Sequence, residues 1–259
     1  MIDLESGTGV AIKADPQQHQ LILPDDFEPT TYRTRRLHDL SAVWHCPITE
    51  PDQIAYWYSA GLTRSEDSQR WAETNIIYGI VFFHPLSSDG EFVKSSGQFH
   101  PPTGPTQTAT PEIYTVLHGV GYFLLQKARA PYTDVTDPIL VEVHAGESFI
   151  VPPDYGHLQI NPTSEPLIFS YVVMDGMSGV YEPYRQTQGA MYYVLDNGEQ
   201  KHQLNERYPN PAELRVLRAS ELDQHPLLTE PITYHSVLSN LDEISFITQP
   251  DRFPADAYL

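Results

Sequence analysis

The sequence is short of cysteine, since Cys46 is the only one in 259 residues. A lone cysteine excludes an intrachain disulfide framework. Long apolar runs are also missing, because none approaches the roughly 20 residues that span a bilayer. Residues 1–7 contain neither the basic stretch nor the apolar core of a signal peptide. We therefore expect a cytoplasmic protein with no membrane partner.

Basic residues are scarce as well. The chain has 15 lysines and arginines against 34 acidic residues, which gives a formal net charge of −19. A surface of this charge repels nucleic acid and anionic membranes, so neither is an expected partner. The same field opposes a phosphorylated ligand. Such a ligand needs local positive charge, part of which a bound metal can supply.

The chain has neither internal repeats nor low-complexity tracts. All-β barrels of this length are often single domains. We predict an N-terminal arm over residues 1–45, a barrel over 46–199 and a C-terminal extension over 200–259 that packs on the barrel. Within the predicted barrel, residues 49–60 are compatible with a short helix that carries Pro51 in its first turn.

Short strands dominate the pattern from about residue 74. Residues 76–83 form a nearly continuous β-branched and aromatic run, which predicts a strand buried on both faces. The further expected strands are 91–94, 112–117, 121–126, 139–143, 148–151, 157–160 and 167–173. Short strands separated by regular turn residues predict an all-β barrel or sandwich. In the tail, 214–218 and 232–237 fit extra strands, and 240–246 fits a closing turn or helix.

Three residues of this region are candidate metal ligands. His100, Glu112 and His157 each lie near the end of a predicted strand, so they can meet at one point inside a small barrel. Two imidazoles and a carboxylate suit a divalent transition metal.

The segments around these residues resemble the motifs of the cupin-type (archaeal-type) glucose-6-phosphate isomerases. The matching segments are Gly97-Gln98-Phe99-His100-Pro101, Pro111-Glu112-Ile113-Tyr114-Thr115-Val116-Leu117-His118-Gly119, Leu124-Leu125-Gln126 and the upstream Arg35-Arg36-Leu37-His38-Asp39-Leu40. The resemblance implies an all-β fold, the cupin double-stranded β-helix or jelly-roll barrel, with a few short helices and a C-terminal extension. It also implies a homodimer.

The implied reaction converts glucose 6-phosphate to fructose 6-phosphate through a cis-enediol, as in glycolysis and gluconeogenesis. The resemblance implies a divalent metal (Fe, Ni, Mn or Zn) held by His100, Glu112 and His157. It assigns the catalytic base to Glu112 and a second catalytic position to Tyr181. A metal-bound glutamate is a weaker base, because the cation lowers its pKa.

The resemblance also implies a substrate-binding set. Hydroxyl groups of Ser95 and Ser96 stand where the family holds a phosphate, and Tyr114 and Gln126 match positions that face the cavity. Strand alternation supports one of these placements, because it puts Tyr114 on the same face as Glu112.

The sequence departs from the family pattern at the first motif histidine, which is Gln98 here. An amide oxygen is a weaker ligand than imidazole for iron, nickel or zinc. Ligation through Gln98, a site with three protein ligands and a barrel without metal all remain open. Two further family positions, a His and a Tyr, are occupied by Gly179 and Val173.

These departures leave two alternatives to the isomerase. One is a diverged cupin enzyme that catalyses another isomerisation, epimerisation or cyclisation of a small metabolite. The other is a non-catalytic sugar-binding cupin. The basic residues nearest to the motifs that could neutralise a phosphate are Lys94, Lys127 and Arg185. None belongs to a motif, so we expect each of them to be a solvated surface charge.

Overall fold

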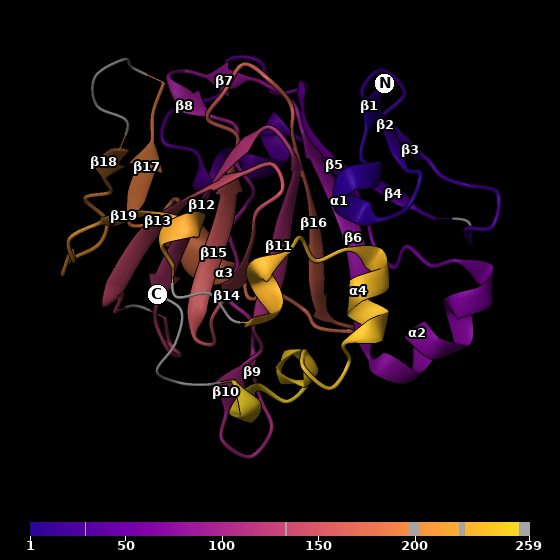
Figure 1. The fold of residues 1–259 in the computed structure, drawn as a ribbon. Coiled ribbons are helices and arrows are strands. Elements are labelled where there is room, and N and C mark those ends of the chain that lie inside the picture. The colour runs from indigo at the N-terminus through magenta and orange to yellow at the C-terminus, as the bar shows by residue number, and fades with distance from the viewer. Residues whose placement is uncertain (29, 133, 197–201, 223–225, 254–259) are drawn as a thin grey trace.

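The computed structural model describes residues 1–28, 30–132, 134–196, 202–222 and 226–253. Two sheets face each other around a common core and form a barrel (Figure 1). The strand order is β14-β11-β16-β6-β5-β4 in the larger sheet and β15-β12-β13-β19 in the smaller one. All neighbouring strands of these sheets are antiparallel except β13 and β19, which are parallel. The predicted jelly-roll barrel is confirmed.

The strands of the larger sheet are β4 (Tyr32–Arg36), β5 (Ile54–Ser59), β6 (Ile76–Phe83), β11 (Glu112–His118), β14 (Ser148–Val151) and β16 (Leu167–Met174). The strands of the smaller sheet are β12 (Val120–Lys127), β13 (Asp137–His144), β15 (Tyr155–Ile160) and β19 (Arg215–Arg218).

Small hairpins and short helices surround the two sheets. The minor strands are β1 (Ile2–Asp3), β2 (Lys13–Asp15), β3 (Gln20–Ile22), β7 (Ser87–Ser88), β8 (Glu91–Phe92), β9 (Pro102–Thr103), β10 (Thr108–Ala109), β17 (Tyr192–Val194) and β18 (His202–Leu204). The α-helices are α1 (Glu5–Thr8), α2 (Ser68–Thr74), α3 (Glu182–Gln186) and α4 (Tyr234–Ser239). The 3₁₀ helices are Leu37–Val43, Ser65–Asp67, Ala219–Glu221, Pro226–Thr229, Ser245–Ile247 and Pro250–Arg252. No helix of the described residues is both long and apolar enough to cross a membrane.

Two local predictions are wrong. The segment 49–60 contains no α-helix; it carries strand β5, whose Tyr56 pairs with Phe83 of β6. Residues 232–237 form no strand, because Thr233 caps helix α4 by accepting a hydrogen bond from the Ser236 N–H at 3.1 Å. The predicted strand at 214–218 is confirmed as β19.

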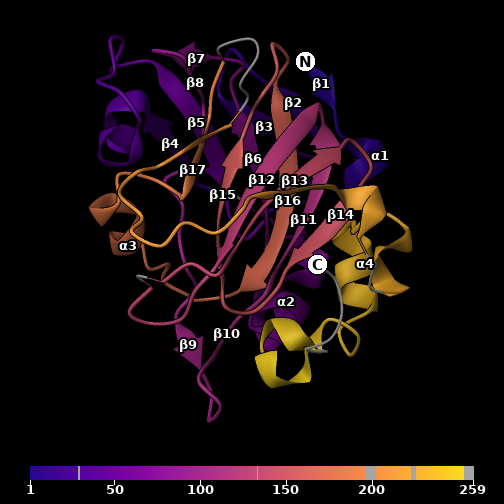
Figure 2. The same cartoon turned by 90° about the vertical axis from the view of Figure 1, so that its left-hand side faces the viewer.

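The larger sheet begins earlier than the predicted barrel. Strand β4 pairs with β5, so residues of the predicted arm, 1–45, form the outer edge of this sheet. The predicted boundary between residues 199 and 200 lies outside the described residues. The loop after His100 carries the β9–β10 hairpin, which projects beyond the end of the barrel in Figures 1 and 2.

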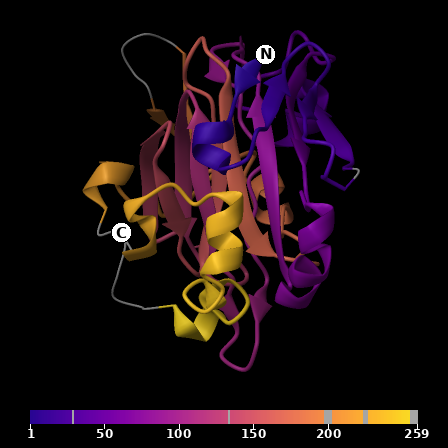
Figure 3. The same cartoon turned by 45° about the vertical axis from the view of Figure 1, so that its right-hand side comes forward.

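Strand β11 lies inside the larger sheet, between β14 and β16, and both of its faces are buried. Tyr114 and Val116 point into the barrel core, whereas Ile113 and Leu117 belong to a second core on the outer face. The chain ends cover that outer face, where α1 and α4 lie across the sheet (Figure 3). Alternation along β11 therefore places the side chain of Glu112, the first residue of the strand, inside the barrel.

Candidate metal centre and pocket

A short extended segment brings the first motif to the second. Gln98 and His157 exchange backbone hydrogen bonds of 3.0 and 2.9 Å, and Phe99 does the same with Val180 at 3.0 and 2.8 Å. The residues before His100 are thus held between β15 and the chain near residue 180. This pairing fixes the position from which His100 enters the barrel.

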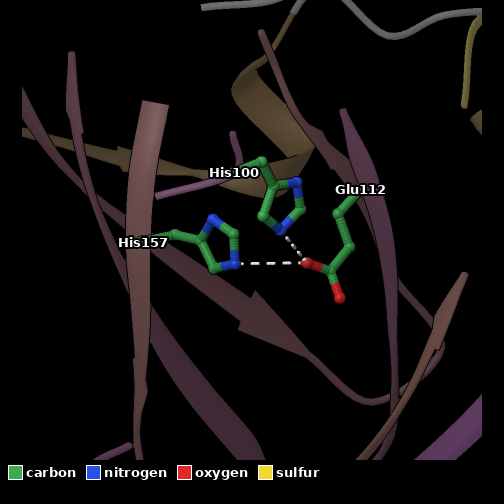
Figure 4. A group of neighbouring side chains, drawn as sticks. All are labelled: His100, Glu112 and His157. Carbon is green, nitrogen blue, oxygen red and sulfur yellow. Dashed lines mark ion pairs between the residues drawn. The ribbon is translucent and has the colours of Figure 1, made fainter. Parts of the chain in front are cut away.

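His100, Glu112 and His157 converge on one point (Figure 4). Oε2 of Glu112 lies 3.2 Å from Nε2 of His100 and 3.1 Å from Nε2 of His157. The side chains of the three residues are only 2%, 5% and 1% exposed, in chain order. The two imidazole rings are nearly perpendicular, at 87°, with centroids 5.0 Å apart.

The arrangement leaves ligand atoms without hydrogen bonds. Nδ1 of His100 lies 2.7 Å from the carbonyl oxygen of Thr110. A carbonyl only accepts, so Nδ1 carries a proton and Nε2 is the nitrogen that faces the centre. Within the described part of the chain, Oε2 of Glu112 and both ring nitrogens of His157 have no hydrogen-bond partner. Unpartnered polar atoms are costly inside a protein, and a shared divalent cation would satisfy Oε2 of Glu112 and Nε2 of His157.

The electrostatics of the three residues suit the same ligand. Burial alone would raise the pKa of Glu112, but the two adjacent imidazoles outweigh it and lower this pKa to about 2. Burial is the main influence on His157 and its pKa is lowered, although the Glu112 carboxylate acts to raise it. At neutral pH the glutamate is therefore ionised and this imidazole is neutral, which are the protonation states that bind a metal.

Glu112 and His157 lie in the wall of a cavity of about 510 Å³. The predicted residues Ser95, Ser96, Gln98, Tyr114 and Tyr181 line the same cavity. His100 borders a second, smaller cavity of about 280 Å³ together with Phe99, Tyr132 and Tyr155. The centre therefore lies where the larger cavity reaches the barrel core.

Two of the predicted substrate-binding residues are held by Gln159. The Oγ of Ser95 accepts a hydrogen bond from the Gln159 N–H at 3.2 Å, and the Tyr114 hydroxyl accepts one from Gln159 Nε2 at 2.8 Å. Tyr181 is 39% exposed, so it stands at the open end of the cavity.

Gln126 differs from this set, because it is not among the described residues that line the cavity. Its Nε2 donates to the Tyr208 hydroxyl at 3.1 Å and its Oε1 accepts from the Met191 N–H at 3.0 Å. Both ends of the amide are thus bonded within the protein. The structure therefore places the Gln126 amide in the packing of the following chain segments, and its assignment to substrate binding stays a prediction.

The three basic residues named from the sequence lie in different environments. Lys94 is buried, pairs with Glu91 and lies over the rings of Trp44 and Tyr193 at 5.5 and 5.1 Å, so the expected surface charge is wrong for this residue. The Lys127 ammonium lies over the Tyr155 ring at 5.5 Å. Arg185 lines the cavity.

Sequence reasoning missed several lining residues, namely Arg33, Arg35, Tyr56, Tyr58 and Tyr171. For Arg33 and Arg35 the sequence did hold a signal, since the two arginines alternate about Thr34 just before Arg36-Leu37 of the family motif. Its meaning depends on where strand β4 joins the sheet, which no local pattern reveals.

Comparison with known proteins assigns the chain to a family. A family model described as glucose-6-phosphate isomerase (GPI) matches residues 34–210. The chain belongs to the glucose-6-phosphate isomerase family. This match covers more than half of the chain and includes the last three residues of β4, the three converging residues and α3. No curated protein matched the sequence.

Similar solved structures include two oxalate enzymes. Oxalate decarboxylase from Bacillus subtilis is 18% identical over 49% of this chain and 27% of that chain, with a TM-score of 0.33. A recombinant oxalate oxidase in complex with glycolate is 14% identical over 55% of this chain and 49% of that chain, with a TM-score of 0.29. This chain therefore covers about a quarter and about half of these two proteins, and the family assignment rests on the match over residues 34–210.

The two main departures from the glucose-6-phosphate isomerase pattern are in contact with each other. Oε1 of Gln98 points at Gly179, where an added Cβ would lie only 2.1 Å from it. Nε2 of Gln98 lies 3.5 Å from Nε2 of His100. The amide thus presents its nitrogen to His100, and ligation through the oxygen requires the amide to turn over. Gly179 leaves the space that the Gln98 side chain occupies.

Proposed function

We propose that this protein is a metal-dependent sugar-phosphate isomerase that interconverts glucose 6-phosphate and fructose 6-phosphate. The family assignment supports the reaction class. The observation that carries the proposal is the convergence of His100, Glu112 and His157, with unpartnered ligand atoms, in the wall of a cavity of about 510 Å³. Small-molecule sites commonly have volumes of about 300–1,000 Å³.

The metal would be held by Nε2 of His100, Nε2 of His157 and Oε2 of Glu112. Bound there, a divalent ion supplies electrophilic stabilisation of the negative charge that develops on the sugar oxygens. We propose Fe, Ni, Mn or Zn, which accept this combination of nitrogen and oxygen ligands.

Isomerisation needs a base within hydrogen-bond reach of the C–H next to the carbonyl. The carboxylates among the described lining residues are Asp39 and Glu112. Asp39 accepts a hydrogen bond from the Arg36 N–H at 2.8 Å and lies 3.4 Å from a ring nitrogen of His38. We assign the proton transfer to Glu112, which is ionised at neutral pH because the imidazoles hold its pKa at about 2.

Tyr181 provides a hydroxyl group at the open end of the cavity. Burial raises the pKa of its phenol, so it stays protonated at neutral pH. A protonated phenol donates a hydrogen bond to a sugar oxygen, and we assign this role to Tyr181.

The contact between Gln98 and Gly179 favours a second candidate function. The pair changes the shape and the donor groups of the cavity next to His100. A diverged enzyme that uses the same centre for another isomerisation or epimerisation of a small metabolite would fit these changes.

The test measures the metal content of the purified protein and its conversion of glucose 6-phosphate and fructose 6-phosphate in both directions. Wild type should contain metal and interconvert the two sugars. Glu112→Gln should lower kcat/KM by about 10²- to 10⁴-fold, because it removes the transferring carboxylate. Glu165→Gln, on an exposed loop, is the matched control. Metal without turnover of either sugar would favour the second candidate, and a protein that takes up no metal would contradict both.

A further inference from the structure

Three arginines face the cavity from two separate elements. Arg33 and Arg35 lie on strand β4, and Arg185 lies on helix α3. In the sheet, Arg33 pairs with Tyr58 and Arg35 with Tyr56, and all four line the cavity. The intervening Thr34 pairs with Trp57, which packs in the outer core. Alternation therefore directs both β4 arginines toward the side of this edge strand that faces the cavity.

None of these three guanidiniums lies within ion-pair distance of a carboxylate in the described part of the protein. Four other arginines do form such pairs: Arg64, Arg129, Arg215 and Arg218. The remaining arginines, Arg36, Arg70, Arg207 and Arg252, form no such pair either, but each donates to an oxygen of a residue outside the cavity. Among the described contacts, the three cavity arginines make one hydrogen bond, from Arg35 to the carbonyl of its neighbour Thr34 at 3.5 Å. The carboxylate in this part of the cavity, Asp39, is already bonded to the Arg36 backbone.

The arginines and the candidate metal centre lie at different ends of the same cavity. Strand β4 is the edge of the larger sheet, and β5, β6 and β16 separate it from β11, which carries Glu112. Tyr181 is close enough to both ends to feel their charges. Burial is the main cause of its raised pKa, and of the smaller effects Arg35 lowers this pKa and Glu112 raises it. A ligand with a reactive carbon at one end and a charged group at the other would match this layout.

We propose that Arg33, Arg35 and Arg185 form a phosphate-binding subsite that holds the phosphorylated end of the substrate away from Glu112. Guanidinium groups bind phosphate oxygens through paired, charge-assisted hydrogen bonds. Two arginines on alternate positions of one strand and a third from α3 approach such a group from two directions. The hydroxyls of Ser95 and Ser96 line the same cavity and add neutral donors.

This inference rests on the proposed function, and it adds the residues that select a phosphorylated sugar over the free sugar. The negative charge of the protein makes the selection sharper. An anion is repelled over most of the surface and attracted where the three guanidiniums line the cavity.

The test compares wild type with Arg33→Gln/Arg35→Gln, with Arg185→Gln and with the control Arg36→Gln. Arg36 is the next residue of β4, and its side chain donates to the Asp52 carbonyl outside the cavity. Titration calorimetry measures binding of inorganic phosphate, glucose 6-phosphate and glucose, and circular dichroism with thermal melting checks folding.

Wild type should bind both phosphate compounds, and the double variant should bind them about 10- to 100-fold more weakly, the size expected for lost charge-assisted hydrogen bonds. Arg185→Gln should show a smaller loss. Arg36→Gln should remain within about twofold of wild type, as is usual for surface substitutions. In the isomerase assay, KM for glucose 6-phosphate should rise more than kcat falls.

Equal affinity of wild type and the double variant for phosphate and glucose 6-phosphate would overturn the subsite, as would a wild type that binds neither. The two proposals fail separately. Arginine-dependent binding without turnover refutes the isomerase and leaves the subsite standing. Turnover that keeps its KM in the double variant refutes the subsite alone.

Discussion

The two faces of the larger sheet are built for different tasks. On the outer face, Ile113 and Leu117 of β11 pack against the chain ends, and Ser148 accepts a hydrogen bond from the Ile232 N–H at 3.1 Å, which ties the C-terminal segment down. On the inner face, Glu112 of the same strand meets two imidazoles without a hydrogen bond to its Oε2 among the described residues. Adjacent residues of β11 thus face the buried outer core and the candidate metal centre.

Unpartnered buried atoms sharpen this comparison. Elsewhere in the described residues they occur one at a time, as at Trp57 and Tyr78. At the centre, two of them, Oε2 of Glu112 and Nε2 of His157, lie only 3.1 Å apart. Isolated unpartnered atoms are ordinary defects of packing, whereas a group of them around one point indicates a missing ligand. Substitutions on the inner face should therefore change metal binding and turnover, and those on the outer face should change stability.

The largest effect should follow from removing a ligand on the inner face. His157→Ala should weaken metal binding by at least about 100-fold, since even residues that merely support a metal ligand contribute about 10- to 100-fold. Metal content after dialysis and kcat/KM should fall together. His144→Ala, which removes a half-exposed imidazole paired with Glu142, is the control. Retention of the metal by His157→Ala would break the distinction between the faces.

The outer face should respond in the opposite way. Ile113→Ala leaves a cavity between β11 and the chain ends, because Ile113 is fully buried there. We expect the free energy of unfolding to fall by about 2–5 kcal/mol. Urea unfolding measures this change. Metal content and kcat/KM at a temperature where the variant is folded should stay near wild type, and a large loss of metal would show that the faces are not independent.

A substitution on the inner face should also be able to increase metal affinity. Gln98→His places an imidazole beside Nε2 of His100, where the amide now presents its nitrogen at 3.5 Å. Metal affinity should rise by about tenfold, because imidazole is a better ligand than an amide for these metals. Competition with a chelator measures the change. An unaltered affinity would remove position 98 from the metal ligands and leave a centre with three protein ligands.

The smallest expected effect lies in the outer covering. Thr233→Ala removes the side chain that caps α4 through the Ser236 N–H. Loss of such a cap typically costs about 1 kcal/mol. The shift of the thermal midpoint should therefore be smaller than for Ile113→Ala, with unchanged metal content. Thr233→Ser, which keeps the capping hydroxyl, is the control.

Much of the inner face was predictable because it is encoded locally. Alternation around Glu112 gave its face, and the motif histidines gave the other two members of the cluster. The main barrel strands from β6 to β16 followed from β-branched and aromatic runs bounded by turns. These signals extend over only a few residues. They agree with the folded structure because the strands are largely buried on both faces.

The errors have two causes: pairing with partners distant in sequence, and a local helix cap that outweighs β-propensity. Pro51 suggested a helix start, but pairing with β6 makes Tyr56 and Trp57 part of a strand. In 232–237 the cap at Thr233 outweighs the β-branched residues, so a helix forms. The role of Arg33 and Arg35 was not readable because it depends on β4 joining the edge of the sheet. The link between Gln98 and Gly179 is likewise a contact across the fold.

The most direct test of the account is anomalous X-ray scattering from crystals grown with a divalent transition metal. The account predicts one strong peak about 2.0–2.3 Å from Nε2 of His100, Nε2 of His157 and Oε2 of Glu112. An empty centre in metal-supplemented crystals, or a metal bound only at other residues, would contradict it.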